Sequence, residues 1–154
     1  MKNKGLWFFG LAGSGKTFCS KLSYNLVKKK MIPILLDGDN FRKQISFDLK
    51  YTKHDREIQL KRLYGASKIL IENKVFPIVT SVFMNKETLK KCKMSKILVI
   101  KIQRDYNKII KSRDIYKKEK NVVGKDIFYQ NLKTEVINNT DKKYLYKNLK
   151  KLVN

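Results

Sequence analysis

The stretch Gly10-Leu11-Ala12-Gly13-Ser14-Gly15-Lys16-Thr17 follows directly on the apolar run Leu6-Trp7-Phe8-Phe9. It fits the pattern G-x-x-x-x-G-K-[ST] at every fixed position. Glycines let the backbone turn tightly enough for several N–H groups to converge on one phosphate group, and a helix beginning near Gly15 adds the positive end of its dipole. The sequence therefore predicts a loop that binds a nucleoside triphosphate, placed between a buried strand and an amphipathic helix.

The positions of this loop have different expected contacts with the nucleotide. Lys16 is expected to reach the β- and γ-phosphates and to take part in catalysis. The Thr17 hydroxyl is expected to ligate the Mg²⁺ ion that bridges these phosphates. The remaining nucleotide contacts are expected from the turn itself, through Gly10, Ala12, Gly13, Ser14 and Gly15. The competing interpretation is a glycine-rich helix start that has no ligand.

Apolar residues recur along the chain at spacings that alternate between strand and helix. Strands are expected at residues 6–9, 31–36, 75–83, 97–102 and 134–137, and helices at 16–30, 40–47, 55–73, 106–118 and 141–152. Strands that alternate with helices form parallel sheets, so we expect an α/β protein with a three-layer αβα P-loop NTPase fold and a mainly parallel sheet of about five strands. No linker or internal repeat divides the chain, which predicts a single domain.

The chain has 154 residues, with 36 Lys and Arg against 13 Asp and Glu, and a formal net charge of +23. Such a charge attracts phosphates and nucleic acid. The excess is mostly lysine scattered along the sequence, and no cluster of aromatic residues accompanies it, so a nucleic-acid partner is not expected. A nucleotide- or RNA-binding module without catalysis remains the alternative from another class of function.

The two cysteines, Cys19 and Cys92, are too few for a disulfide framework, which favours a reduced, cytoplasmic protein. No apolar run approaches the ~18 residues that a membrane span needs, so no membrane partner is expected. His54 is the single histidine and is interpreted as a solvated residue near a helix start.

A second candidate site, Leu35-Leu36-Asp37-Gly38-Asp39-Asn40-Phe41-Arg42, follows the second expected strand. Ligands of open α/β sheets bind beyond the carboxyl ends of the strands, so Asp37 and Asp39 can face the γ-phosphate. One carboxylate could hold Mg²⁺ through water while the other accepts the proton of an attacking hydroxyl, and Arg42 would pair with an anionic acceptor. The alternative is an Asx turn with a helix cap. The small size, and the lack of a guanine-reading Asn/Thr-Lys-x-Asp segment, favour a kinase of a small metabolite.

These segments together resemble the adenylylsulfate kinase family. The resemblance rests on residues 10–17, 35–42 and 48–56, and on Arg113-Asp114, Tyr116-Lys117-Lys118 and Asn121–Ile127 in the family's order. It covers nearly the whole chain and implies a single P-loop kinase domain, residues 1–154, with a lid at about 115–126. It also implies ATP and Mg²⁺ as cofactors, a phosphotransferase acting on the 3′-hydroxyl of adenylylsulfate, and a homodimer as the family's usual state.

The resemblance further implies roles for the matching residues. Asp39 is the expected base, and Asp37 supports it or the metal. Arg113 would lie against the adenine of ATP, and Lys117 or Lys118 in the lid would neutralise charge as the site closes. Acceptor contacts are expected from Asp39, Asn40, Arg42, Tyr51 (stacked on the acceptor base), Arg56, Gln59, Lys117, Lys118 and Val122.

The departures from the family pattern concern the acceptor. Tyr51 stands where the family usually has Phe, Gln59 where it has Asn, and Phe83-Met84-Asn85 where it has Ile-Ser-Pro. The lid is shorter, and Val122 replaces an aromatic residue. The Asn-Val-Val-Gly and Gly-Leu-Ala-Gly-Ser-Gly segments resemble a subgroup associated with capsule polysaccharide modification. A cytidine diphosphoramidate kinase is therefore the alternative to an adenylylsulfate kinase.

Overall fold

The structure of the protein is a computed structural model that describes residues 2–153. One all-parallel sheet has the strand order β2-β3-β1-β4-β5. Its strands are β1 Gly5–Phe9, β2 Ile32–Asp37, β3 Val75–Ser81, β4 Ile97–Gln103 and β5 Glu135–Asn138. The expected α/β fold with five parallel strands is confirmed.

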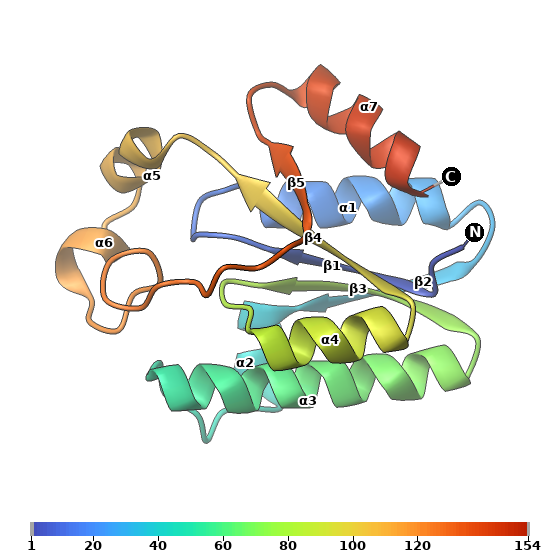
Figure 1. Cartoon of the computed structure of the whole chain (residues 1–154), viewed down its shortest axis with the longest axis horizontal. Helices are drawn as coiled ribbons and strands as arrows, with labels where there is room; N and C mark the ends of the chain where they lie inside the picture. Colours follow the sequence, from blue (N-terminus) through green and yellow to red (C-terminus); the bar gives the residue numbers. More distant parts are fainter. Residues whose placement is uncertain (1, 154) are drawn as a thin grey trace.

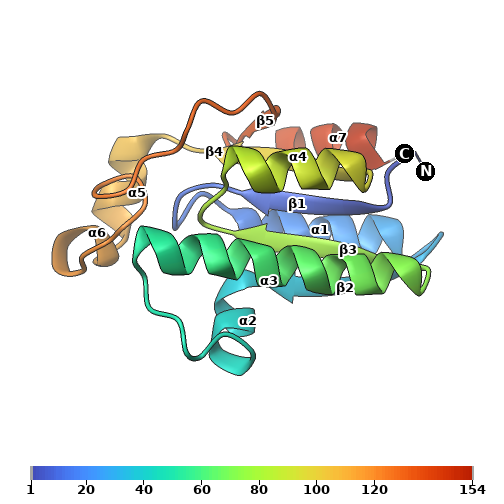
Figure 2. The ribbon, with the colours of Figure 1, turned by 60° about the horizontal axis from the view of Figure 1, so that its bottom comes forward.

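Helices cover both faces of this sheet, which gives three layers (Figures 1 and 2). Helices α3 and α4 lie on one face and α1 and α7 on the other, while α5 and α6 lie beyond the carboxyl ends of the strands (Figure 1). The helices are α1 Lys16–Val27, α2 Gly38–Gln44, α3 Lys53–Glu72, α4 Lys86–Met94, α5 Tyr106–Ser112, α6 Ile115–Lys118 and α7 Lys142–Val153.

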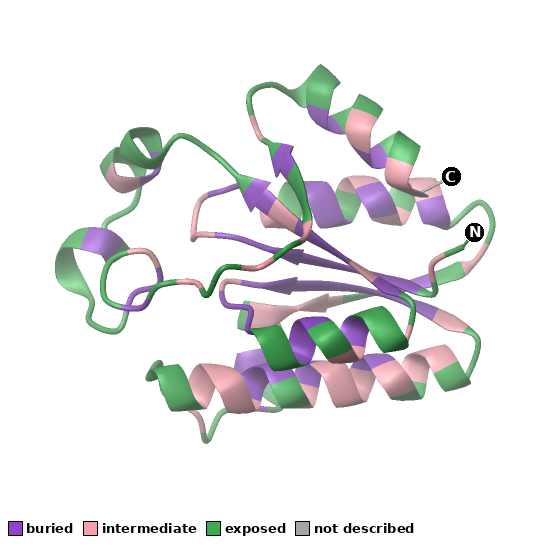
Figure 3. Cartoon of the chain, in the orientation of Figure 1, coloured by how far each residue is buried: buried purple, intermediate pink, exposed green. Residues whose placement is uncertain are grey.

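The central strand β1 is buried along its whole length, as expected for a parallel strand covered on both faces (Figure 3). Successive side chains of a strand point to opposite faces. Trp7 and Phe9 therefore pack into the core that includes Leu63 of α3. Leu6 and Phe8 pack into the second core, under α1 and α7. Burial on both faces fixes β1, and the loop that follows it starts from a rigid position.

Two expectations about helices are wrong. The single helix expected at residues 106–118 is two helices, because Arg113 between them has an extended backbone, with φ −137° and ψ 112°. Helix α4 was not expected, although its N-cap is visible in the sequence: the Asn85 side chain accepts a hydrogen bond of 2.8 Å from the Thr88 amide. Leu89 and Cys92 form its buried face.

Both cysteines are free and buried, and burial raises the pKa of each thiol to about 12. Neither thiol is a nucleophile at neutral pH. His54 is exposed in the first turn of α3, in agreement with the interpretation as a solvated residue. Among residues 2–153, no helix has the length and apolar character that crossing a membrane requires.

Candidate active site

A cavity of about 420 Å³ lies at the carboxyl ends of β1, β2 and β3. It brings together most of the predicted site residues, which come from segments far apart in the sequence. We call residues 10–17 the loop wall, and Arg42, Tyr51, Arg56 and Gln59 together the helix wall. Predicted residues that line the cavity are Ala12, Gly13, Gly15, Lys16, Thr17, Asp37, Asp39, Arg42, Tyr51, Arg56, Gln59 and Arg113.

The loop wall begins directly after β1 and ends in α1. Gly13 and Gly15 have φ angles of 88° and 103°, in the left-handed region that glycine adopts without strain. Gly15 caps α1, which has no side-chain cap, so the free N–H groups of its first turn are left for a ligand. This is the geometry in which a helix start binds a phosphate group.

Lys16 is the cation of the loop wall. Its ammonium group donates to the Leu11 carbonyl at 2.9 Å. Burial lowers the Lys16 pKa from 10.5 to about 8, and the carboxylates of Asp39 and Asp37 only partly offset this effect. The protein alone therefore does not fully stabilise the protonated Lys16 ammonium group, and the phosphates of a nucleotide would supply further negative charge.

Asp37 and Asp39 have different environments although one residue separates them. One Asp37 oxygen accepts from the Asp39 and Asn40 amides at 3.2 and 3.1 Å, which caps α2. The other accepts from the Thr80 hydroxyl at 2.9 Å. The cap interpretation thus describes Asp37, whose oxygens are engaged by the protein. The Asp39 carboxylate is exposed at the cavity and is the one placed to receive a proton.

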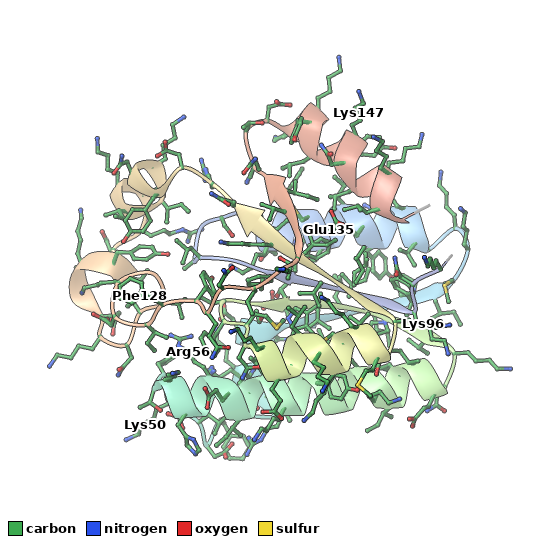
Figure 4. All side chains as sticks on the ribbon, in the orientation of Figure 1. Lys50, Arg56, Lys96, Phe128, Glu135 and Lys147 are labelled. Atoms are coloured by element: carbon green, nitrogen blue, oxygen red, sulfur yellow. The ribbon has the colours of Figure 1, made fainter. Side chains whose placement is uncertain are left out.

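The helix wall carries two arginines close to one aromatic ring. The guanidinium carbons of Arg42 and Arg56 lie 5.0 and 5.6 Å from the Tyr51 ring centre. Arg42 donates to the Lys50 carbonyl at 2.6 Å, and Arg56 donates to the Asn121 carbonyl at 2.9 Å. Figure 4 shows Arg56 near the start of α3, on the side of the lid.

This wall has positive charge and polar atoms without partners. Neither Arg42 nor Arg56 forms an ion pair within residues 2–153. Burial, and then the charge of Arg42, lower the pKa of Arg56. The Arg56 Nε and Gln59 Oε1 atoms are buried without a protein hydrogen-bond partner. Buried polar atoms are normally paired, so this wall has the properties of a site for an anion that also donates a hydrogen bond.

Gln59 connects α3 with the start of α2, the two helices that carry predicted acceptor-binding residues. Its Nε2 donates to the Gly38 carbonyl at 3.1 Å, which ties α3 to the start of α2, beside Asp39. The same contact turns Gln59 Oε1 away from Gly38. The relative position of the helix wall and Asp39 is therefore fixed by a side chain that is 5% exposed.

The lid, residues 115–126, is docked on both walls. The Tyr116 hydroxyl donates to the Ala12 carbonyl at 3.0 Å. Gly124 packs on Leu11 so closely that a Cβ atom there would lie 2.6 Å from a Leu11 methyl carbon. On the other side, Arg56 holds the Asn121 carbonyl. This segment therefore contacts both the loop wall and α3, although none of its residues lines the cavity.

Some predicted residues do not line the cavity. Gly10 and Ser14 belong to the loop wall but do not line the cavity. Asn40 is exposed on α2, and Lys117 and Lys118 are exposed on α6. Val122 is 4% exposed and packs with Ile109 and Tyr116 in a small apolar cluster of the lid. The role of Gly10 and Ser14 in binding ATP, and that of the other four residues in binding the acceptor, remain predictions.

The sequence did not lead us to predict a role at the site for four residues: Thr80, Arg104, Tyr116 and Asn139. Thr80, the last residue but one of β3, donates to Asp37. Arg104 follows β4 and donates to the Gly13 carbonyl at 3.2 Å, and Asn139 follows β5 and donates to the Ser14 carbonyl at 2.7 Å. A polar residue at the carboxyl end of an expected parallel strand was the available signal for these three.

The oxygen donors near the loop suit a Mg²⁺ ion. Thr17 supplies a hydroxyl, and Asp37 and Asp39 supply carboxylates, all on the lining of one cavity. Within the described part of the chain, no group of three Cys, His, Asp or Glu side chains could hold a metal by itself. Mg²⁺ binds through few protein oxygens together with water and substrate phosphates, so the donor set fits this ion.

The chain is similar in sequence to known proteins of one family. A sequence model described as adenylylsulphate kinase matches residues 2–123. An adenylyl-sulfate kinase of Clostridium kluyveri is 33% identical over 129 residues, which is 79% of this chain and 64% of the relative. One of Prochlorococcus marinus is 37% identical over 81 residues, 52% of this chain and 39% of the relative. The chain thus spans less than two thirds of the length of either relative.

Solved structures of similar shape cover almost the whole chain. The APS kinase of Mycobacterium tuberculosis, in complex with AMPPNP and APS, has a TM-score of 0.84 at 20% identity, covering 99% of this chain and 96% of that one. A gluconokinase of Sinorhizobium meliloti has a TM-score of 0.62 at 11% identity, with 99% and 94% covered. At these identities the likeness concerns the fold.

Proposed function

The chain belongs to the adenylylsulfate kinase family, and from this premise we propose that it transfers the γ-phosphate of ATP to the 3′-hydroxyl of adenylylsulfate. One observation carries the proposal: Lys16, Asp39 and the two arginines of the helix wall line one cavity. A cation for the donor phosphates, a carboxylate for the acceptor hydroxyl and an anion-binding wall thus stand together. Two free, buried thiols agree with action in the cytoplasm.

The loop wall would hold the phosphates of ATP. The N–H groups at the start of α1 bind the β-phosphate, and Lys16 exchanges its contact with the Leu11 carbonyl for the β- and γ-phosphate oxygens. A bound Mg²⁺, held by the Thr17 hydroxyl, would neutralise developing negative charge on the phosphates. The Arg113 side chain lies 3.2 Å from where a Gly13 Cβ would stand, and it would lie against the adenine of ATP.

Asp39 would act as the base of the transfer. The acceptor hydroxyl oxygen attacks the γ-phosphorus, the bond from this phosphorus to the β–γ bridging oxygen breaks, and ADP leaves. The hydroxyl proton passes to the Asp39 carboxylate. Asp37 holds the start of α2, and with it the backbone of Asp39, through its cap hydrogen bonds.

The helix wall would bind the acceptor. The charge on the phosphate and sulfate of adenylylsulfate suits Arg42 and Arg56, which lack a carboxylate partner among the described residues. The Gln59 Oε1 atom accepts a hydrogen bond from an N–H or O–H group of the acceptor. Tyr51 is 56% exposed, and its ring can cover the acceptor only where the two guanidinium groups leave it free.

The test is ATP-dependent phosphorylation of adenylylsulfate and, side by side, of cytidine diphosphoramidate, with products identified by mass spectrometry. We expect one added phosphate on adenylylsulfate and none in a Lys16→Ala control, because this variant loses the cation of the loop wall. A product from the cytidine compound alone would overturn the proposed acceptor and retain the reaction type. Nucleotide binding without any product would overturn the proposed kinase activity.

A further inference from the structure

Side chains hold the carbonyl groups of the phosphate-binding loop, and three of the four donors come from outside the loop. Four consecutive carbonyl groups of the loop each accept a hydrogen bond from a side chain. The donors come from four different places in the fold: α1, α6, the end of β4 and the end of β5. The pairs are Lys16 to Leu11 at 2.9 Å, Tyr116 to Ala12 at 3.0 Å, Arg104 to Gly13 at 3.2 Å and Asn139 to Ser14 at 2.7 Å.

Fixing a carbonyl group also fixes the N–H group of the same peptide unit. A peptide unit is planar, so a held carbonyl leaves its N–H little freedom to rotate. The N–H groups of such a nest must point together at a phosphate, and any disorder of the loop has to be removed when the ligand binds. A donor that holds a carbonyl before binding can therefore increase affinity for the phosphates without touching them itself.

Asn139 is the most rigidly placed of these donors. Its own backbone N–H donates to the Gln103 carbonyl at 2.7 Å, which continues the β4–β5 pairing by one residue. Its amide lies so close to Gly15 that a Cβ atom at position 15 would collide with it. The other three donors are less suited to a permanent role: Arg104 is exposed, Tyr116 belongs to the lid, and Lys16 must turn to the ligand.

We propose that Asn139 is a positioning residue for the donor nucleotide, because its amide holds the Ser14–Gly15 peptide bond in the orientation that binds the phosphates. This inference rests on the proposed function only for the identity of the nucleotide. The amide acts at the turn where the loop becomes α1, which is where the N–H groups for a phosphate are concentrated. Asn139 directly follows β5, a strand that the phosphate-loop pattern does not include.

Binding of MgADP and of adenosine by isothermal titration calorimetry tests the role of Asn139. We expect Asn139→Ala to weaken MgADP binding about 10-fold, in line with a lost hydrogen bond to a site that binds charge, and to leave adenosine binding unchanged. Asn139→Asp keeps the shape but offers no N–H to Ser14 and adds negative charge, so the loss of MgADP affinity should be larger. Asn148→Ala is the matched control, since this amide donates to the Tyr144 carbonyl at 2.8 Å within α7.

Each result decides for or against the role of Asn139. Unchanged MgADP affinity in both Asn139 variants would overturn it, as would an equal loss for adenosine and MgADP together with a lower melting temperature, which would indicate a general folding role. Failure of the wild-type protein to bind MgADP would overturn it as well. Wild-type binding without turnover of any acceptor would overturn the proposed function and leave the Asn139 measurement valid, because that measurement needs no acceptor.

Discussion

The two walls of the cavity are built in opposite ways. The loop wall is eight consecutive residues that present backbone groups, and its single charged side chain, Lys16, belongs to the same segment. The helix wall presents side chains from α2, from α3 and from the segment between them. Backbone groups keep their ligand contacts when nearby side chains vary. In a wall of side chains, a substitution can alter which ligand binds.

The difference in construction between the two walls agrees with the positions at which the sequence departs from the family pattern. The loop wall keeps every fixed position of its pattern, and the departures at Tyr51 and Gln59 lie in the helix wall. A scaffold can therefore keep its phosphate donor while the acceptor site varies. The following variants test whether the two walls are as separate in function as they are in construction.

Asp39→Asn should have the largest effect, because Asp39 stands between the two walls and serves the reaction rather than binding. We expect turnover to fall by about 100-fold or more while the Kd for ATP changes little, since the amide cannot take the proton. Steady-state kinetics and calorimetry measure the two quantities. Asp37→Ala is the comparison: loss of the α2 cap should lower the unfolding free energy by about 1 kcal/mol, a change that Asp39→Asn should not produce.

Arg56→Ala should affect the acceptor far more than the phosphate donor, although it also removes the contact with the Asn121 carbonyl. We expect the KM for adenylylsulfate to rise about 10-fold or more, because a charged hydrogen bond to the acceptor is lost, and the KM for ATP to stay within about 2-fold. Arg62→Ala is the control on the same helix, where Arg62 pairs with Asp48 at the surface. A rise in the KM for ATP equal to that for the acceptor would show that the walls do not act separately.

The smallest effect concerns the protonation of Lys16 in the loop wall. Its pKa of about 8 in the free protein means that the ammonium loses its proton as the pH rises through 8. Phosphates favour the charged form, so MgADP binding near pH 9 should take up about one proton, and binding near pH 6.5 almost none. Calorimetry in buffers of different ionisation enthalpy measures the uptake. Lys16→Arg, which stays charged, should bind without it, and a wild-type protein that takes up no proton at pH 9 would contradict the lowered pKa.

Sequence reasoning succeeded where the physical cause is local. The glycine pattern and the apolar run before it specify the loop, and the spacing of apolar residues specifies the five parallel strands. The cap interpretation and the catalytic interpretation of Asp37-Gly38-Asp39 were both reasonable from spacing. The structure assigns the cap to Asp37 and the cavity position to Asp39.

Contacts across long stretches of sequence could not be predicted in this way. The Arg56 contact with Asn121 and the burial of Val122 in the lid depend on how the lid folds back over α3, which no periodicity records. The break at Arg113 divides a segment whose composition favours a continuous helix. Helix α4 is different, because its Asn85 cap and its apolar spacing were visible and its existence could have been predicted.

The contact between Ser14 and Asn139 has a consequence for the synthesis of the protein. The phosphate-binding loop is among the first segments to leave the ribosome, but its partner Asn139, directly after β5, follows 125 residues after Ser14. The loop's own strand, β1, also needs β3 and β4 as neighbours on either side. A nascent chain therefore carries the whole nucleotide-binding pattern long before its loop has this contact, and we expect ATP to bind more tightly once β5 has joined the sheet.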